Sequence, residues 1–253
     1  MTRSFQKTLI ATALLTTLGA QAATVTVAAG DTYKGLTFTG ADTISFSTDL
    51  LGALDTGKVV LSPINGATGV VQKDADGFYT QADITAKLKS FDINDSTNRI
   101  LNAYSVGGSN QTSPALKSVS SGGFVTIGDL WSDRTAKAVH GTLTGGNGVG
   151  TINDMIIWNI ATIQGDSPLI AAGNYTTTFS GLTVTSTAFD AISKSLGLLT
   201  LGKSALSGVS DFGTITSRLT VTAVTPAVPE PATYAMMGLG MIGMAIAARR
   251  RRG

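Results

Sequence analysis

Residues 214–222 read Thr-Ile-Thr-Ser-Arg-Leu-Thr-Val-Thr, and this stretch decides the fold class. Because side chains along a β-strand point alternately to opposite faces, Ile215, Leu219 and Val221 share one face with Ser217. The threonines and Arg218 occupy the other face. The stretch therefore predicts a strand with one apolar and one polar face, on which Ser217 is the single polar residue of the apolar side.

The same alternation recurs along most of the chain. Turn residues such as Asn65-Gly66 and Asp76-Gly77 separate the alternating runs. Many short strands at close spacing are typical of a sandwich or a barrel, and we predict an all-β, sandwich-like antiparallel domain. The further predicted strands are Val25–Val27, Leu36–Phe38, Ile44–Phe46, Lys58–Leu61, Phe124–Ile127, Ala138–Leu143, Met155–Ile160, Asn174–Phe179 and Leu182–Ser186.

One short amphipathic helix is predicted among these strands. Phe189, Ile192, Leu196 and Leu199 recur at intervals of three and four residues behind a Ser186-Thr187 start. Residues 83–91 fit both a helix and a strand, because their apolar positions match either period. The sequence does not decide between a helix and a strand for this segment.

The N-terminal residues have the form of a secretory signal peptide. Arg3 and Lys7 precede an apolar run over residues 8–18, which ends in Ala20-Gln21-Ala22. A basic start, a short apolar run and a small-x-small exit predict cleavage after Ala22, with Ala20 and Ala22 as the recognised small residues. The protein is therefore expected to be exported.

The C-terminal residues have three parts. Val228-Pro229-Glu230-Pro231-Ala232 is followed by an uncharged apolar run over residues 233–248 and then by four arginines. Sixteen helical residues cover about 24 Å at 1.5 Å per residue, slightly less than a bilayer core of about 30 Å. We predict a single transmembrane helix whose basic tail stays in the cytoplasm and stops transfer. The arginines of that tail are Arg249, Arg250, Arg251 and Arg252.

This order of a Pro-Glu-Pro motif, an apolar helix and an arginine block resembles the PEP-CTERM sorting signal. The resemblance covers only the last 26 residues of the chain. It implies a bacterial envelope protein that an exosortase, a membrane-embedded transpeptidase-like enzyme, recognises at Pro229-Glu230-Pro231 and cleaves nearby. It also implies sorting to the cell surface, often beside exopolysaccharide. The chain then divides into a signal peptide (1–22), a secreted β-rich domain (23–225) and a spacer with the sorting signal (226–253).

The composition of the body excludes several classes of function. The leader and the sorting signal carry six of the 18 basic residues and the only glutamate, Glu230. The remaining body has 12 basic and 15 acidic side chains, a net charge of −3, so no basic surface for nucleic acid is expected. The chain has no cysteine, which excludes disulfides, thiolate metal sites and a cysteine nucleophile.

Catalytic residues are not evident in the sequence. His140 is the only histidine, and its nominal triad partners Ser132, Asp133 and Ser167 lie in no recognisable nucleophile motif. The acidic residues of the body are all aspartates, mostly near turns, and no pair suggests glycosidase chemistry. We predict a protein that is not an enzyme and needs no cofactor.

Two aspartate-rich stretches and two tryptophans complete the candidates. Residues 73–77 and 92–98 offer oxygen ligands for calcium, but neither has the spacing of a complete calcium loop, and hairpin turns are the preferred interpretation, with no metal site. Trp158 lies in the most apolar strand and is predicted to be core, whereas Trp131 is the better candidate for stacking on a sugar.

The sequence thus predicts an exported surface protein, held at the inner membrane by its C-terminal helix and processed by an exosortase. The body is expected to be a structural or interaction module of the cell surface or the exopolysaccharide matrix. The alternative is a module that binds or hydrolyses polysaccharide.

Overall fold

The computed structural model describes residues 23–224, which form a mostly antiparallel β-structure with few helices. The elements in chain order are β1 (Thr24–Ala28), β2 (Thr32–Tyr33), β3 (Leu36–Phe46), α1 (Thr48–Thr56), β4 (Val60–Ile64), β5 (Thr68–Lys73), β6 (Tyr79–Asn94), β7 (Arg99–Val106), β8 (Gly108–Leu116), β9 (Ser120–Asp133), β10 (Ala138–Gly145), β11 (Gly150–Gln164), β12 (Gly173–Val184), α2 (Ser186–Ser195), α3 (Thr200–Ser207) and β13 (Gly213–Ala223).

The sheet closes on itself as an antiparallel barrel. Strands β6, β3, β13, β12, β11, β10 and β9 follow one another, and β7 pairs with both β9 and β6. β8 and β4 extend the sheet beyond β9, and β5 extends it beyond β6. The predicted sandwich is therefore wrong in its arrangement. The physical reason is β7, which joins the two ends of the sheet through three residue pairs with β9.

The strand prediction for residues 214–222 is confirmed. These residues lie in β13, where Ile215, Ser217, Leu219 and Val221 are buried and the residues between them are more exposed. Residues 83–91, which fitted either period, lie in β6. Their neighbours β3, β5 and β7 supply the hydrogen bonds that settle the strand.

The predicted helix is confirmed as α2, which begins after the N-cap residue Thr185 and ends at Ser195. Leu199, the last residue of the predicted stripe, lies outside it as the N-cap of α3. The expectation of a single helix is wrong, because α1 and α3 also form. The side chain of Ser47 caps α1 by accepting a hydrogen bond from the Leu50 backbone N–H at 3.1 Å. Within residues 23–224 no helix is long and apolar enough to cross a membrane. The predicted signal peptide and the predicted membrane segment 233–248 lie outside these residues.

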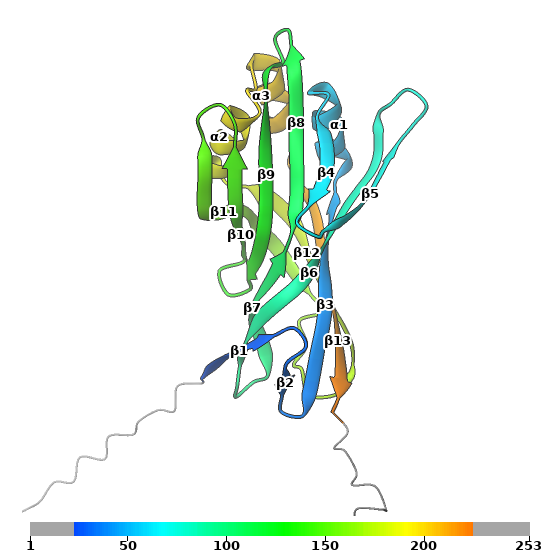
Figure 1. Ribbon diagram of the computed structural model, residues 1–253, viewed down its shortest axis with the longest axis vertical. Helices are drawn as coiled ribbons and strands as arrows, with labels where there is room; N and C mark the ends of the chain where they lie inside the picture. The colour runs from blue at the N-terminus through cyan, green and yellow to red at the C-terminus, as the bar shows by residue number, and fades with distance from the viewer. Residues whose placement is uncertain (1–22, 225–253) are drawn as a thin grey trace, which may run out of the picture.

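The body is elongated, with different elements at its two ends (Figure 1). Helices α1, α2 and α3 gather at one end, whereas β1, β2 and the end of β13 lie at the other. We call this second end the base. It comprises residues 29–35 with strand β2, the turn at residues 95–98, the loop at residues 165–172 and Val224, which hydrogen bonds link to one another.

The interior contains two apolar clusters. The larger includes Leu54, Ile157 and Phe212 and brings the helices together with the strands around them. The smaller includes Phe38 and Phe91, which are fully buried and meet edge to face with ring centroids 5.1 Å apart. Because aromatic pairs of this geometry add to the gain from burial, they anchor the half of the barrel near the base.

Polar side chains occupy the junction of the two clusters. Arg134 is only 7% exposed, donates to the Asp166 carboxylate at 2.7 Å and lies over the ring of Phe179. Burial lowers the pKa of Arg134, and Asp166 and Asp42 partly oppose that effect. Asp42 is paired in register with Ser217 and lines a cavity of about 30 Å³. Burial raises the pKa of Asp42, and the Ser217 hydroxyl and the charge of Arg134 offset this only in part. Ser217, the polar residue on the apolar face of its strand, belongs to this layer.

Candidate functional site

Three ring side chains form a row on the outer wall of the barrel. Tyr104 of β7, Trp131 of β9 and His140 of β10 are directly opposite one another in register. Their chain neighbours, including Ala103, Ser105, Ser132 and Val139, are buried. Since successive strand residues point to opposite faces, the three rings project outward, where they remain half-buried.

The rings stack on one another. The Trp131 and His140 rings have centroids 3.9 Å apart and planes inclined by 21°, and those of Tyr104 and Trp131 are 5.5 Å apart at 28°. Because β7 and β10 flank β9 on opposite sides, both faces of the indole are covered. The sequence suggested that Trp131 stacks on a sugar, but neither face of its indole is free to do so. Trp131 supports the ring of Tyr104 instead.

Asp154 of β11 fixes one end of this row. Its Oδ1 accepts the indole N–H of Trp131 at 3.0 Å and lies 3.0 Å from Nδ1 of His140. The Asp154 side chain is 68% exposed, and its backbone has a φ of +53°, in the left-handed region that non-glycine residues rarely adopt. The local backbone thus turns this carboxylate back toward the two rings.

His140 has a carboxylate partner, but no nucleophile is hydrogen-bonded to it among the described residues. Ser132 is buried on the opposite face of its strand, and Asp133 accepts the backbone N–H groups of Thr135 and Ala136 in a turn. Ser167 lies in the loop at the base. Among residues 23–224 no hydroxyl group is hydrogen-bonded to His140, so the triad considered from the sequence is not assembled there.

A shallow depression of about 250 Å³ lies at the other end of the row. Thr26, Lys89, Ser90, Asp92 and Tyr104 line it. Tyr104 pairs with Ser90 of β6. One face of its ring contacts Trp131, and the opposite face is turned toward this depression. A register shift in β6 between Leu88 and Ser90 places Lys89 at a bulge.

The carboxylate of Asp92 is fixed in the wall of this depression. Its Oδ1 accepts the Thr26 hydroxyl at 2.6 Å, and its Oδ2 accepts the Asn102 amide at 2.9 Å and the Tyr104 hydroxyl at 2.8 Å. Burial by itself would raise the pKa of Asp92, but these three hydrogen bonds outweigh it and the pKa is lowered. Burial and the bond to Asp92 raise the pKa of Tyr104 to about 12. The pair is therefore a fixed carboxylate and a fixed, neutral phenol at ordinary pH.

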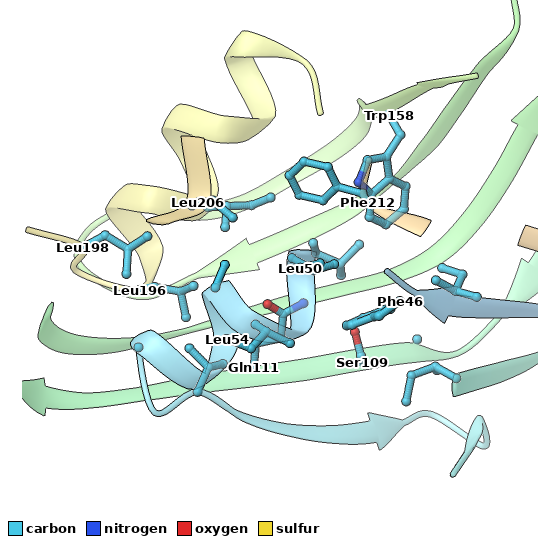
Figure 2. A pocket seen from close by; sticks show the side chains of 18 of the residues that line it. Phe46, Leu50, Leu54, Ser109, Gln111, Trp158, Leu196, Leu198, Leu206 and Phe212 are labelled. Carbon is cyan, nitrogen blue, oxygen red and sulfur yellow. The ribbon is translucent and has the colours of Figure 1, made fainter. Parts of the chain in front are cut away.

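A second candidate is an apolar pocket at the helical end (Figure 2). Leu50 and Leu54 of α1, Leu196, Leu198 and Leu206 from the α2–α3 region, and Phe212 converge on it, together with Trp158. Its cavity volume is about 50 Å³, well below the roughly 150 Å³ of an engineered cavity that binds benzene. Trp158 is 7% exposed, which confirms its predicted place in the core. The pocket is interior space between helices and sheet rather than a ligand site.

The two aspartate-rich stretches form turns. Asp74 Oδ1 accepts the backbone N–H groups of Asp76 and Phe78, and Asn94 Oδ1 accepts those of Ser96 and Thr97. Asp95 is engaged with Tyr33 and Lys34. In the described part of the chain no group of three or more acidic or histidine side chains could hold a metal ion.

Comparison with known proteins identifies the C-terminal segment of the chain. Residues 227–252 match the PEP-CTERM protein-sorting motif. The chain carries a PEP-CTERM sorting motif. This confirms the resemblance noted in the sequence, and it implies export, association with the envelope and an exosortase as the processing partner. Comparison with curated proteins and with solved structures gives no match.

The sorting residues themselves lie outside residues 23–224. These are Val228, Pro229, Glu230 and Pro231, and the basic tail Arg249–Arg252. The PEP-CTERM match covers them but gives no geometry. The sequence singled out Trp131 and His140 by their rarity, and Asp92 as part of the stretch 92–98. It gave no sign of Tyr104, which joins Trp131 through the β7–β9 register, or of Asp154, whose carboxylate reaches the two rings.

Proposed function

We propose that the body is a non-catalytic saccharide-binding module, delivered to the cell surface by its PEP-CTERM motif. The observation that carries this proposal is the depression beside Tyr104, where an aromatic ring and a fixed carboxylate stand side by side. A pyranose ring has an apolar C–H face and a rim of hydroxyl groups. It matches such a wall because the ring can pack on Tyr104 while its hydroxyls reach polar neighbours.

The polar neighbours have complementary roles. Within residues 23–224, Asp92 Oδ1 accepts one hydrogen bond, from Thr26, so it retains capacity to accept a sugar hydroxyl. Lys89 is exposed at the rim and can donate, and the Ser90 hydroxyl can do either. The stack of Trp131 and His140, held by Asp154, fixes Tyr104 before the ligand arrives. Such preorganisation lowers the entropy lost on binding.

The same geometry favours binding over hydrolysis. A glycosidase needs a carboxylic acid with a raised pKa as its general acid, whereas the hydrogen bonds of Asp92 lower its pKa. His140 is paired with Asp154 and has no neighbouring nucleophile among the described residues. We therefore propose that the module has no enzymatic activity, and that its place is the surface or the exopolysaccharide matrix.

Tyr104→Ala tests the binding site. The variant is expected to bind polysaccharide at least about tenfold more weakly, which corresponds to about 1.4 kcal/mol, because the aromatic wall is lost. Isothermal titration with polysaccharides first identified on a glycan array provides the measurement. Tyr104→Phe keeps the ring and should retain most of the affinity, and Phe78→Ala, an exposed aromatic on the β5–β6 turn, should retain all of it. Unchanged affinity in Tyr104→Ala, or no glycan bound by the wild type, would contradict the proposal.

We also propose that processing requires recognition of Glu230 between its two prolines. The prolines restrict φ and disfavour helix in the residues before them, so the motif is suited to an enzyme that reads an extended strand. Glu230→Ala is expected to accumulate as a precursor that keeps Arg249–Arg252, detected by intact-mass measurement of the protein from cells. Glu230→Asp, which keeps the charge, is the matched control. Normal maturation of Glu230→Ala would rule out this role.

A further inference from the structure

The folded body reaches almost to the sorting motif. β13 ends at Ala223, and the backbone N–H of Val224 donates to the carbonyl of Gly35 at 2.9 Å. The match to the motif begins at residue 227. Only residues 225 and 226 separate the described body from the matched segment.

This spacing limits the distance between the base and the processing enzyme. Pro229 follows Val224 by five residues, and a fully extended chain spans at most about 3.6 Å per residue. The motif can therefore lie no more than about 18 Å from the base. An enzyme that encloses the motif in its active site has to bring its own surface against that end of the body.

We propose that the base docks on the exosortase while the motif is being processed. The base is a defined surface, because hydrogen bonds tie its segments together. The Lys34 ammonium donates to the Asn98 side chain at 2.9 Å, and the Leu169 backbone N–H donates to the Asn98 carbonyl at 2.8 Å. β1, β2 and the C-terminal end of β13 lie at this end of the body (Figure 1).

The chemistry of the base points to an apolar contact. Lys34 of the base pairs with Asp95 and Asp166 pairs with the neighbouring Arg99, so Asp31 is the one charged side chain of the base without an ion pair among the described residues. Ile170, by contrast, is 73% exposed, the highest value among the exposed large apolar side chains of residues 23–224, and Val224 is 44% exposed. The centre of a protein interface is depleted in charge and rich in apolar contact. Ile170 is thus the natural centre of the docking surface.

Ile170→Glu tests the contact, and the inference rests on the motif recognition proposed above. In cells that contain the exosortase, pulse labelling followed by intact-mass measurement should show severalfold slower maturation of this variant. The matched control is Leu201→Glu on α3 at the opposite end of the body, which is 55% exposed and should mature at the wild-type rate. Maturation of Ile170→Glu at the wild-type rate would overturn the proposal.

A longer spacer between the body and the motif distinguishes two causes of slow maturation, the loss of docking and damage to the fold. A 12-residue Gly/Ser insertion after Val224 adds a mean reach of about 19 Å and frees the motif from the base. In that background Ile170→Glu and its parent should mature at equal rates. An equal slowing by Ile170→Glu with and without the insertion would overturn docking. Normal maturation of Glu230→Ala would instead refute recognition of the motif, so the two failures are distinct.

Discussion

Arg134→Met is expected to lower the free energy of unfolding by about 3–5 kcal/mol, the cost of removing one partner from a buried ion pair. The guanidinium is 7% exposed, donates to Asp166 at 2.7 Å and attracts the Asp42 carboxyl. Methionine would keep much of the packing against Phe179, but it would leave Asp42 without the charge of Arg134 and Asp166 with Arg99 alone. Urea denaturation of the purified protein at neutral pH measures the loss.

A matched control is Arg99, the second arginine that pairs with the Asp166 carboxylate. Arg99 also pairs with Asp166, at 3.1 Å, but its side chain is 47% exposed. Because water screens exposed pairs, Arg99→Met should lower the free energy of unfolding by no more than about 1 kcal/mol. Equal losses in the two variants would show that burial of Arg134 is not what makes the interaction strong.

The strands of this body could be predicted more readily than their arrangement. The period of two along residues 214–222 is a local property and identified β13. Closure of the sheet depends on three residue pairs between β7 and β9, centred on Ala103 and Ser132. Nothing in either strand marks that pairing, because it joins residues far apart in the chain. Helix α1, in contrast, had a readable signal in Ser47 and the leucines that follow.

The functional residues show the same limit. Trp131 and His140 were noticed separately because each residue type is rare in the chain, but their stacking follows from the β9–β10 register. Ser217 was placed by its position on the apolar face of its strand, but nothing in the sequence indicated a partner for its hydroxyl. Its partner Asp42 lies 175 positions earlier in the sequence, and only the β3–β13 register brings the two together.

That interior carboxyl should cost stability at neutral pH. Burial raises the folded-state pKa of Asp42 despite the Ser217 hydroxyl and Arg134. A group with a raised folded pKa contributes its full stability below the unfolded pKa, and this contribution is lost as pH rises through the folded value. Asp42→Asn keeps the shape without the charge. It is therefore expected to be more stable than the wild type at pH 7, by about 1.4 kcal/mol for each unit by which the folded-state pKa of Asp42 exceeds the unfolded one.

The pH dependence distinguishes this cause from better packing. The advantage of Asp42→Asn should shrink as pH falls and vanish once Asp42 is protonated in both states, because the wild-type carboxyl is then neutral as well. Urea denaturation between pH 3 and pH 8 follows the difference, and Asp31→Asn at the exposed base should change stability by no more than about 0.5 kcal/mol. A loss of stability in Asp42→Asn at pH 7 would mean that attraction to Arg134 outweighs burial. Asp42 and Arg134 would then form a pair that stabilises the fold. In the opposite case Arg134 is stabilised by Asp166, and the buried Asp42 carboxyl destabilises the fold.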